Sequence, residues 1–244
     1  MALVATRTIT LSVVSHRQNA LVNVLLEDVL RSCAERVNLI LTLNVPDRTP
    51  LALETLACPV EVIENAQRKG FGANHNAAFR RCKTPYFCVS NPDIRLPADP
   101  FPALIASLEG DRSGVTGPLV RRPSGGVEDS ARRFPTAASL LKKVFIDTRE
   151  PEYPVDLGPQ DVDWIGGMFM LFRSDAFRAI GGFDEAFFLY YEDVDLCLRL
   201  GKAGRSVIFD PRAEVVHAAR RDSRRSPAHA MHHLASALRF LMRS

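Results

Sequence analysis

Long apolar runs are missing from this chain of 244 residues. No stretch approaches the roughly 20 consecutive apolar residues that a helix needs to cross a bilayer. Residues 1–10 also lack the apolar core of a secretory signal. We therefore expect a cytoplasmic protein without a membrane-spanning segment.

Cysteines, net charge and sequence repeats are equally sparse. The five cysteines are odd in number and scattered among apolar residues, which favours reduced, buried thiols over a disulfide framework or a zinc site. With 31 basic and 28 acidic residues, the net charge of +3 is too small to indicate nucleic-acid binding. No repeat or low-complexity linker divides the chain, so a single domain is predicted.

Apolar, β-branched segments alternate with amphipathic ones over the first hundred residues. Strands are predicted at 8–15, 37–43, 60–64 and 86–90, and helices at 19–33 and 72–82. This alternation favours an α/β fold with a mostly parallel sheet and right-handed crossovers. Ligands of such sheets lie beyond the carboxyl ends of the strands. The residues expected along that edge are Ser15, His16, Arg17, Asn44, Asn65, Asn91, Pro92 and Asp93.

The second half has a different pattern. Strands are predicted at 114–120, 168–172, 206–209 and 214–217, and helices at 174–180 and 192–199. We expect Ser174 to cap the first of these helices and Gly181 and Gly182 to end it. Residues 128–159 are rich in Arg and Pro and are interpreted as a flexible excursion with a short helix near 137–144. A basic amphipathic helix is expected from Pro227 onward, which suits peripheral contact with a membrane or packing on the domain.

The stretch with the most unusual composition is 181–200, GGFDEAFFLYYEDVDLCLRL. An aromatic run leads directly into Glu192, Asp193 and Asp195 at the start of a helix. Acids are common at helix starts because the helix dipole favours them there. Carboxylates in an apolar, aromatic setting are also a means of tuning a proton acceptor. Both interpretations remain open from this stretch alone.

Asn91, Pro92 and Asp93 follow a strand that is predicted to be buried. The proline ends the strand and places Asp93 at the sheet edge, where a carboxylate either ligates a divalent cation or forms a local turn. The segment NAQRKGFGANHN, at 65–76, places Gly70 and Gly72 before a helix. It is neither of the common glycine-rich nucleotide motifs, so it indicates either phosphate approach or an ordinary turn.

Two further positions carry chemistry of interest. Trp164, the only tryptophan, precedes Gly166 and Gly167; its ring face suits a sugar, although a lone tryptophan also suits a core. His217 ends a predicted strand and is a metal-ligand, phosphate-contact or structural candidate.

Taken together, these segments resemble the family 2 inverting glycosyltransferases with the GT-A fold, and within them the bacterial rhamnosyltransferase branch. The segments are SVVSHRQ, NAQRKGFGANHNAAF, NPDIRL, DWIGGMFMLFR, GGFDEAFFLYYEDVDLCLRL and VVHAARRDS. The resemblance implies one domain over 1–244. It places a nucleotide-sugar-binding half at 1–100, an acceptor and catalytic half at 101–226, and the basic helix at 227–244.

The resemblance also implies residue roles. Asp93 matches the last acid of the Asp-x-Asp-type motif that binds a divalent cation (Mg²⁺ or Mn²⁺), and His217 matches a histidine that completes the metal site. Asn91 stands where many members have the first Asp of that motif. Asp193 matches the general base, with Glu192 as the second choice. Donor contacts are implied for Ser15, His16, Arg17, Asn44, Lys69, Phe71, Gly72, Asn76, Asn91 and Asp93, and a sugar and acceptor pocket for Trp164, Gly166 and Gly167.

The function that the resemblance implies is inverting transfer of a sugar from a nucleoside diphosphate to a hydroxyl group. The donor is expected to be a dTDP- or UDP-sugar, with dTDP-rhamnose as the first candidate. The acceptor is expected to be a cell-surface polysaccharide or a lipid-linked glycan precursor on the inner face of the plasma membrane. Two alternatives stay open, a nucleotidyltransferase and a non-catalytic relative that binds a nucleotide sugar.

Overall fold

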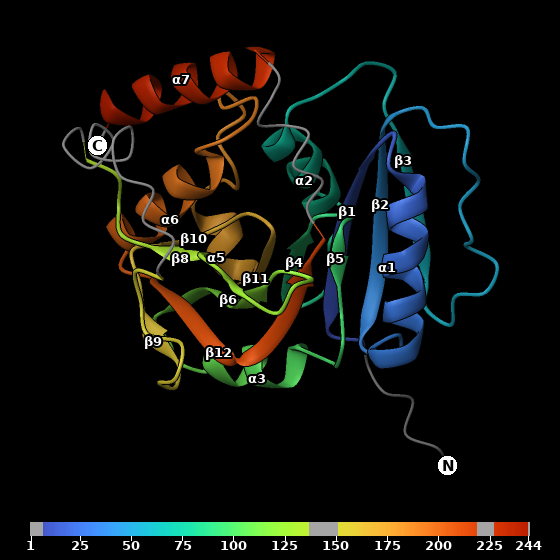
Figure 1. The fold of residues 1–244 in the computed structure, drawn as a ribbon, viewed down its shortest axis with the longest axis horizontal. Coiled ribbons are helices and arrows are strands. Elements are labelled where there is room, and N and C mark those ends of the chain that lie inside the picture. The colour runs from blue at the N-terminus through green and yellow to red at the C-terminus, as the bar shows by residue number, and fades with distance from the viewer. Residues whose placement is uncertain (1–6, 137–150, 219–226, 244) are drawn as a thin grey trace.

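A ten-stranded mixed sheet forms the centre of the computed structural model, which describes residues 7–136, 151–218 and 227–243 (Figure 1). Its main strands are β1 (Ile9–His16), β2 (Val37–Val45), β3 (Val60–Glu64), β4 (Tyr86–Ser90), β5 (Ile94–Arg95), β6 (Ser113–Arg121), β11 (Phe169–Arg173) and β12 (Ser206–His217). The short strands β7 (Val127–Glu128) and β9 (Gln160–Asp161) pair at its margins, and β8 (Ala131–Arg132) pairs with β10 (Trp164–Ile165) separately.

The strand order is β3-β2-β1-β4-β11-β6-β12-β5. The first four strands of this order run parallel to one another, as do β6 and β12. Between these parallel groups, β11 runs antiparallel to both β4 and β6. The predicted, mostly parallel sheet is therefore confirmed, with one reversed strand in its interior.

Helices cover both faces of the sheet because its strands are apolar on both sides. Leu39 and Leu41 pack with α1 (Asn19–Ser32) and α3 (Phe101–Ser107), whereas Ile40 points to the other face. That second face is covered by α2 (Phe71–Phe79), α5 (Ser174–Ala179) and α6 (Glu192–Lys202). The last helix, α7 (Pro227–Leu241), lies across the upper edge in Figure 1.

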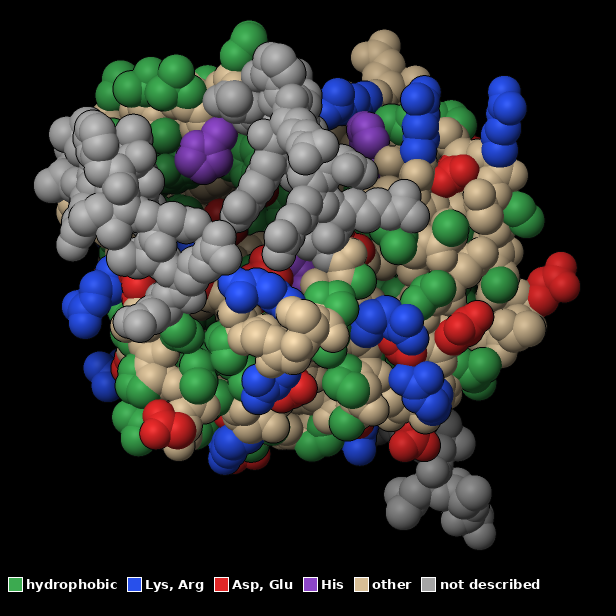
Figure 2. Space-filling view, in the orientation of Figure 1, with side chains coloured by type: hydrophobic (Ala, Val, Ile, Leu, Met, Phe, Trp, Pro, Cys, Tyr) green, Lys and Arg blue, Asp and Glu red, His purple; other side chains and the backbone are tan. Residues whose placement is uncertain are grey.

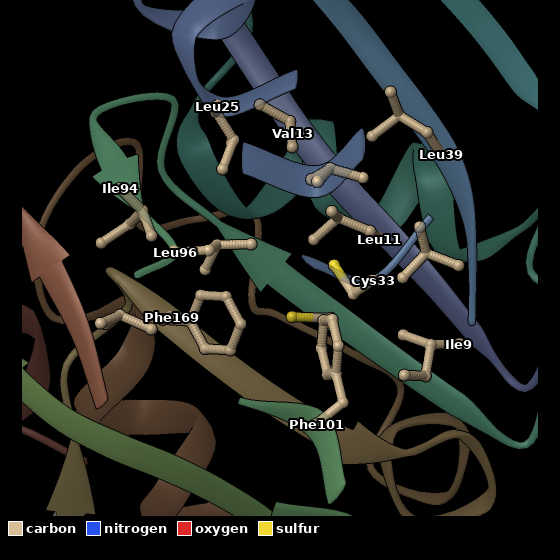
Figure 3. Close-up of a cluster of buried hydrophobic side chains, with 14 of the residues drawn as sticks. Ile9, Leu11, Val13, Leu25, Cys33, Leu39, Ile94, Leu96, Phe101 and Phe169 are labelled. Carbon is tan, nitrogen blue, oxygen red and sulfur yellow. The ribbon is translucent and has the colours of Figure 1, made fainter. Parts of the chain in front are cut away.

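The core on the α1 side joins the two halves of the chain (Figure 3). Leu25 of α1 lies next to Val13 of β1, and Phe101 of α3 and Phe169 of β11 pack in the same cluster on this face of the sheet. The rings of Phe101 and Phe169 are 5.9 Å apart between centroids. Burial of each such side chain contributes about 1.5–3 kcal/mol, so this core fixes β11 against the first half of the sheet.

Several details of the second half differ from the sequence-based predictions. The two strands expected at 206–209 and 214–217 form one strand, β12, because a register shift between Asp210 and Glu214 accommodates Pro211. Ser174 does not cap α5; its hydroxyl donates to the carbonyl of Thr84 instead. Both glycines after α5 are left-handed, as expected for a helix end. The short helix predicted near 137–144 lies outside the described residues.

The cysteines are free thiols, as the sequence predicts, and the helix lengths can be compared with the thickness of a bilayer. All five cysteines are free, and all but Cys82 are buried. Within the described ranges, every helix is too short or too polar to traverse a bilayer.

Candidate active site

A cavity of about 380 Å³ opens at the carboxyl ends of β1 and β4. His16 and Asn44 line it from the ends of β1 and β2, and Asn91 and Asp93 line it from the turn after β4. The loop before α2 and the pair Phe188 and Leu189 complete the wall. The predicted meeting of strand ends at one edge is therefore observed, and it produces a polar cavity.

Asn44 organises one side of this cavity through hydrogen bonds within the protein. Its Nδ2 donates to the carbonyl of Lys69 at 2.9 Å and lies 3.3 Å from Nδ1 of His16. Its Oδ1 accepts from the backbone N–H of Lys69 and from Nδ2 of Asn65. Direct pairing of Asn44 with a nucleotide base would break one of these bonds, so its observed role is to hold the loop before α2.

Two residues expected at the first strand end point elsewhere. The hydroxyl of Ser15 is fully buried and donates to Oδ1 of Asn19, and it accepts the backbone N–H of Gln18. Arg17 is exposed and left-handed, with φ of 58°. Of the three residues predicted there, only His16 lines the cavity, because the chain turns sharply into α1 after it.

The glycines of the loop before α2 serve packing against the segment that leads to α6. A Cβ on Gly70 would lie 2.6 Å from the carbonyl oxygen of Phe188, and one on Gly72 would lie 2.6 Å from Cβ of Phe183. Asn76 does not line the cavity either. Its amide donates to the carbonyl of Phe183 and accepts the N–H of the same residue, both at 2.9 Å. These three positions shape the cavity wall from behind.

Asp93 lies beside His217, as the sequence resemblance implies. Nε2 of His217 is 3.3 Å from Oδ1 of Asp93, and its Nδ1 is 3.1 Å from Oε2 of Glu128. The backbone N–H of Ala218 also donates to the carbonyl of Asp93, which joins the end of β12 to the turn after β4. Burial disfavours the charged imidazole, but the bonds to Asp93 and Glu128 outweigh it and raise the pKa of His217 to about 9.

This pair has the chemistry of a divalent-cation site. Oδ1 of Asp93 is buried, and apart from Nε2 of His217 at 3.3 Å the described residues supply it with no partner. Hard cations take carboxylate oxygens and often keep waters or phosphate oxygens. No group of three or more His, Cys, Asp or Glu side chains in the described ranges is arranged to hold an ion. A cation here would therefore need further oxygens from a bound phosphate and from water.

Asp193 is held at the first turn of α6 by backbone donors. Its Oδ2 accepts the N–H of Gly167 at 2.8 Å, and its Oδ1 accepts the N–H of Val194 at 2.9 Å. Its side chain is partly exposed, whereas Glu192 is only 5% exposed and has one oxygen without a partner. Directly after the aromatic run, Asp193 therefore lies at an accessible position and Glu192 lies in the interior.

The two neighbouring carboxyls have different protonation preferences. Burial raises the pKa of Glu192 well above its ordinary value, and the charge of Asp193 adds to this effect. Burial also raises the pKa of Asp193, but the N–H donors of Gly167 and Val194 and the positive charge of Arg132 act against it. The pKa of Asp193 is raised overall, but these donors and Arg132 stabilise its charge, so Asp193 is the better placed of the two to act as a carboxylate.

Gly167 and Met168 join the two acidic positions. The N–H of Gly167 bonds Asp193, and the carbonyl of the next residue, Met168, accepts the N–H of Asn91 at 2.9 Å. A Cβ on Gly167 would touch both Asp193 and Phe71, each at about 3.5 Å or less. Phe71 lines the cavity, whereas Asp193 is not one of its lining residues and lies behind Phe71, next to Gly167.

Trp164 and Gly166 lie beside this segment. The indole N–H of Trp164 donates to the carbonyl of Arg133, and the guanidinium of Arg132 lies 5.5 Å from the centroid of the indole ring. The N–H of Gly166 donates to the carbonyl of Ser130 at 2.7 Å. The partly buried indole packs between two apolar clusters, so one part of it supports the fold and the rest remains accessible.

Sequence reasoning missed several residues of this site. Glu128 and Arg132 lie within the segment that was interpreted as a flexible excursion, and no local pattern marks either of them. Phe188 and Leu189 belong to the aromatic run, which was noted for its composition but not as a cavity wall. Only the paired geometry with His217, Asp193 and the cavity identifies them.

Two rhamnosyltransferases are similar to this chain in sequence. Rhamnosyltransferase WbbL of Escherichia coli (strain K12) is 33% identical over 186 residues, which cover 71% of this chain and 70% of that protein. The N-acetylglucosaminyl-diphospho-decaprenol L-rhamnosyltransferase of Mycobacterium tuberculosis (strain ATCC 25618 / H37Rv) is 38% identical over 160 residues, covering 59% of this chain and 51% of that protein. The chain thus spans about half the length of the mycobacterial relative.

Solved structures share the fold at low sequence identity. GalNAc-T7 with UDP, GalNAc and Mn²⁺ superposes with a TM-score of 0.65 at 15% identity, over 88% of this chain and 44% of that one. The mannosyltransferase PcManGT from Pyrobaculum calidifontis, in complex with GDP-Man and Mn²⁺, gives 0.63 at 16% identity, over 95% and 64%. These likenesses confirm the predicted GT-A architecture.

The family model for glycosyl transferase family 2 matches residues 11–181, which include β1 to β4, the turn with Asp93 and the segment with Gly167. Together with the WbbL likeness, this match shows that the chain belongs to glycosyl transferase family 2.

Proposed function

We propose that this chain is an inverting glycosyltransferase that moves a sugar from a nucleoside diphosphate to an acceptor hydroxyl. The observation that carries the proposal is the position of Asp193. It is a partly exposed carboxylate, fixed by two backbone N–H groups, one of them from Gly167. Gly167 also faces Phe71, which lines the polar cavity that contains Asp93. A base close to a diphosphate-binding cavity is what a single displacement requires.

Asp193 acts as the general base in this proposal. It accepts the proton of the acceptor hydroxyl, whose oxygen bonds to the anomeric carbon while the bond from that carbon to the diphosphate breaks. Attack from the face opposite the leaving group inverts the centre. Glu192 stays protonated in the interior and keeps a second negative charge away from the base.

The donor diphosphate is assigned to the side of Asp93 and His217. A divalent cation, Mg²⁺ or Mn²⁺, would be held by these two residues and would neutralise charge that develops on the leaving group. Glu128 orients the imidazole through Nδ1, so that Nε2 faces Asp93. With Asn91 in place of an acid, the chain supplies fewer charged oxygens than an Asp-x-Asp motif would.

The sugar and acceptor are inferred from the relatives. Two of them are rhamnosyltransferases by name, and one acts on a decaprenol-linked substrate by name. We therefore propose L-rhamnose from dTDP-rhamnose as the donor sugar and a lipid-linked glycan precursor or cell-surface polysaccharide as the acceptor. Gly167 is assigned to the acceptor side because it contacts Asp193, and Trp164 and Gly166 are assigned there because they precede it on the same segment.

The outer side of α7 is suited to a membrane that carries such an acceptor. Met231, Leu234, Leu238 and Met242 are 53–80% exposed and recur at helical spacing. Figure 2 shows hydrophobic side chains gathered along this helix. The sequence from residue 219 onward contains six arginines and one acid, which complements anionic lipid headgroups. We assign the protein to the inner face of the plasma membrane on this basis.

The test is a thermal-shift screen of nucleotide sugars with Mg²⁺, Mn²⁺ or EDTA, followed by a transfer assay. A ligand present at 100 times its Kd stabilises the native state by about 2.7 kcal/mol, so dTDP-rhamnose with a cation should raise the Tm by several degrees. Transfer of rhamnose with inversion supports the proposal. Stabilisation without transfer to any lipid-linked acceptor would instead favour a non-catalytic binding protein.

A further inference from the structure

The inner side of α7 packs along residues 181–191, which we call the pre-α6 loop. The hydroxyl of Ser236 donates to the carbonyl of Leu189 at 2.9 Å and is 6% exposed as a residue. The imidazole of His232 stacks on Phe188, with centroids 5.1 Å apart and planes 23° from parallel. The helix therefore contacts both residues with which this loop lines the cavity.

Further contacts continue along the same loop. The ring of His233 meets those of Tyr190 and Tyr191, each at 5.3 Å between centroids. Arg243 forms an ion pair with Asp184 near the start of the loop. Aromatic, ionic and hydrogen-bonding contacts thus connect α7 to the loop from its beginning to its end.

The opposite side of the loop belongs to the candidate active site. Phe188 accepts the backbone N–H of Phe71 at 2.9 Å and leaves no space for a side chain at Gly70. The loop is therefore a layer between α7 and the start of α2. Any shift of the loop moves the cavity wall at Phe188 and Leu189.

The loop ends in two residues with a strained backbone, immediately before Glu192 and Asp193. Tyr190 and Tyr191 have φ of 70° and 66°. These values lie in the left-handed backbone region, which residues other than glycine rarely adopt. Such strain persists only where surrounding structure enforces it. The residues that enclose these two tyrosines include His233 and Phe240 of α7. The next residues along the chain are Glu192 and Asp193.

We propose that α7 positions the active site by holding the pre-α6 loop in this strained conformation, with Ser236 and His232 as positioning residues. They touch neither substrate nor reacting atoms; they act through Leu189 and Phe188 on the donor cavity, and through the strained tyrosines on Asp193. The catalytic consequence rests on the proposed function, whereas the structural consequence does not.

Hydrogen exchange of the full chain, followed by mass spectrometry, tests the structural part. Ser236→Ala and His232→Ala, made separately, should each speed exchange in peptides that cover 183–191 and at the amide of Phe71. The expected factor is about fivefold, which corresponds to one ordinary hydrogen bond. Peptides from β1 should keep the parental rate, which shows that the fold is retained. Ser236→Thr, which keeps the hydroxyl, should restore slow exchange.

Ala235→Ser is the matched control, because it changes one oxygen on the exposed side of the same helical turn and should leave loop exchange unchanged. Calorimetric titration with dTDP gives the second readout. Ser236→Ala and His232→Ala should each bind dTDP about fivefold more weakly than the parent. Parental exchange rates in both variants would overturn the inference. Faster loop exchange in a protein that never binds dTDP would uphold the loop's dependence on α7 and count against the proposed donor.

Discussion

Glu192 and Asp193 are adjacent in the sequence but occupy different environments. One is a buried acid with an oxygen that has no partner, and the other is a partly exposed carboxylate with two backbone donors. Burial raises the pKa of both acids, but the N–H groups of Gly167 and Val194 oppose this rise for Asp193. This contrast favours Asp193 as the base on physical grounds that the sequence alone does not provide.

Substitution of each acid should therefore have a different effect. Asp193→Asn removes the proton acceptor and should lower kcat about a thousandfold, within the usual range for loss of a general base. Glu192→Gln imitates the neutral acid and should retain activity within about tenfold. Both values come from steady-state transfer assays, with dTDP affinity as the check on folding. The opposite ranking would make Glu192 the base.

At the residue scale, the order of motifs along the chain predicted that some distant residues meet. It did not predict the local contacts of each residue. Asp93 and His217 meet as the resemblance implied, whereas the contact between Gly167 and Asp193 was not predicted. Ser15, Gly72 and Asn76 were predicted to contact the donor; in the structure they do not line the cavity, and their closest contacts are with Asn19 and Phe183. A small or short polar residue next to a site is found both where the chain contacts a ligand and where it contacts itself. The sequence therefore does not distinguish the two roles.

Single elements were predicted well where periodicity was strong. The bounds of β3 and β4 agree with the sequence to the residue, and α1 differs by one. The short strands β5 and β7 to β10 were missed because two residues do not establish a period, and the seven-residue helix α3 was missed as well. The break expected within β12 was wrong because a proline can sit at a bulge without ending a strand.

The end of α5 provides a test at the scale of one element. Gly181 and Gly182 are both left-handed, but a Cβ on Gly182 would lie 2.4 Å from Oδ1 of Asn76, whereas one on Gly181 meets nothing within 4 Å. Gly182→Ala should therefore lower the free energy of unfolding by about 3 kcal/mol, which adds overpacking to conformational strain. Gly181→Ala should lower it by about 1 kcal/mol. Urea denaturation measures both, and equal losses would exclude the proposed clash.

The link between α1 and the turn after β5 depends on Asp28. Its buried carboxylate accepts from Arg95, Arg31 and the N–H of Leu96. Burial alone would raise the pKa of Asp28, but these donors outweigh it and lower the pKa below the ordinary 3.8. Because the native pKa is the lower one, the stabilisation is complete above pH 3.8 and is lost as the pH falls through the native value.

Asp28→Asn should thus lower the free energy of unfolding by about 3 kcal/mol at pH 7, as expected when one partner of a buried ion pair is removed. The difference from the parent should shrink below pH 3.8. Glu27→Gln, at the exposed neighbouring position, is the control and should change stability by less than about 0.5 kcal/mol. A difference that stayed constant between pH 7 and pH 3 would show that the charge of Asp28 is not what stabilises this link.

At the scale of the whole molecule, α7 has two dissimilar sides. Its inner residues pack on the pre-α6 loop, and its outer apolar residues remain exposed. An amphipathic helix on a folded domain normally hides its apolar side, so exposure of the stripe calls for a partner. The lipid surface proposed above would cover the stripe, and the arginines in the sequence from residue 219 onward suit its anionic headgroups.

Replacement of Met231, Leu234, Leu238 and Met242 by serine should abolish flotation with vesicles that contain anionic lipid, while the inner contacts of α7 are kept. Leu157→Ser changes another exposed leucine, 57% accessible, and should leave flotation unaltered. High salt should weaken binding of the parent, because the arginines contribute through screened attraction. Equal flotation of the parent and the fourfold variant would contradict the membrane assignment.

The reversed strand β11 has a consequence for biosynthesis. Its partner β4 carries Phe87 and Val89 and is complete long before β11 emerges from the ribosome. During that interval β4 is an unprotected, apolar sheet edge, which is the kind of surface that recruits other nascent chains. A chain truncated before β11 should consequently aggregate, and slow translation between the two strands would prolong the same hazard in the cell.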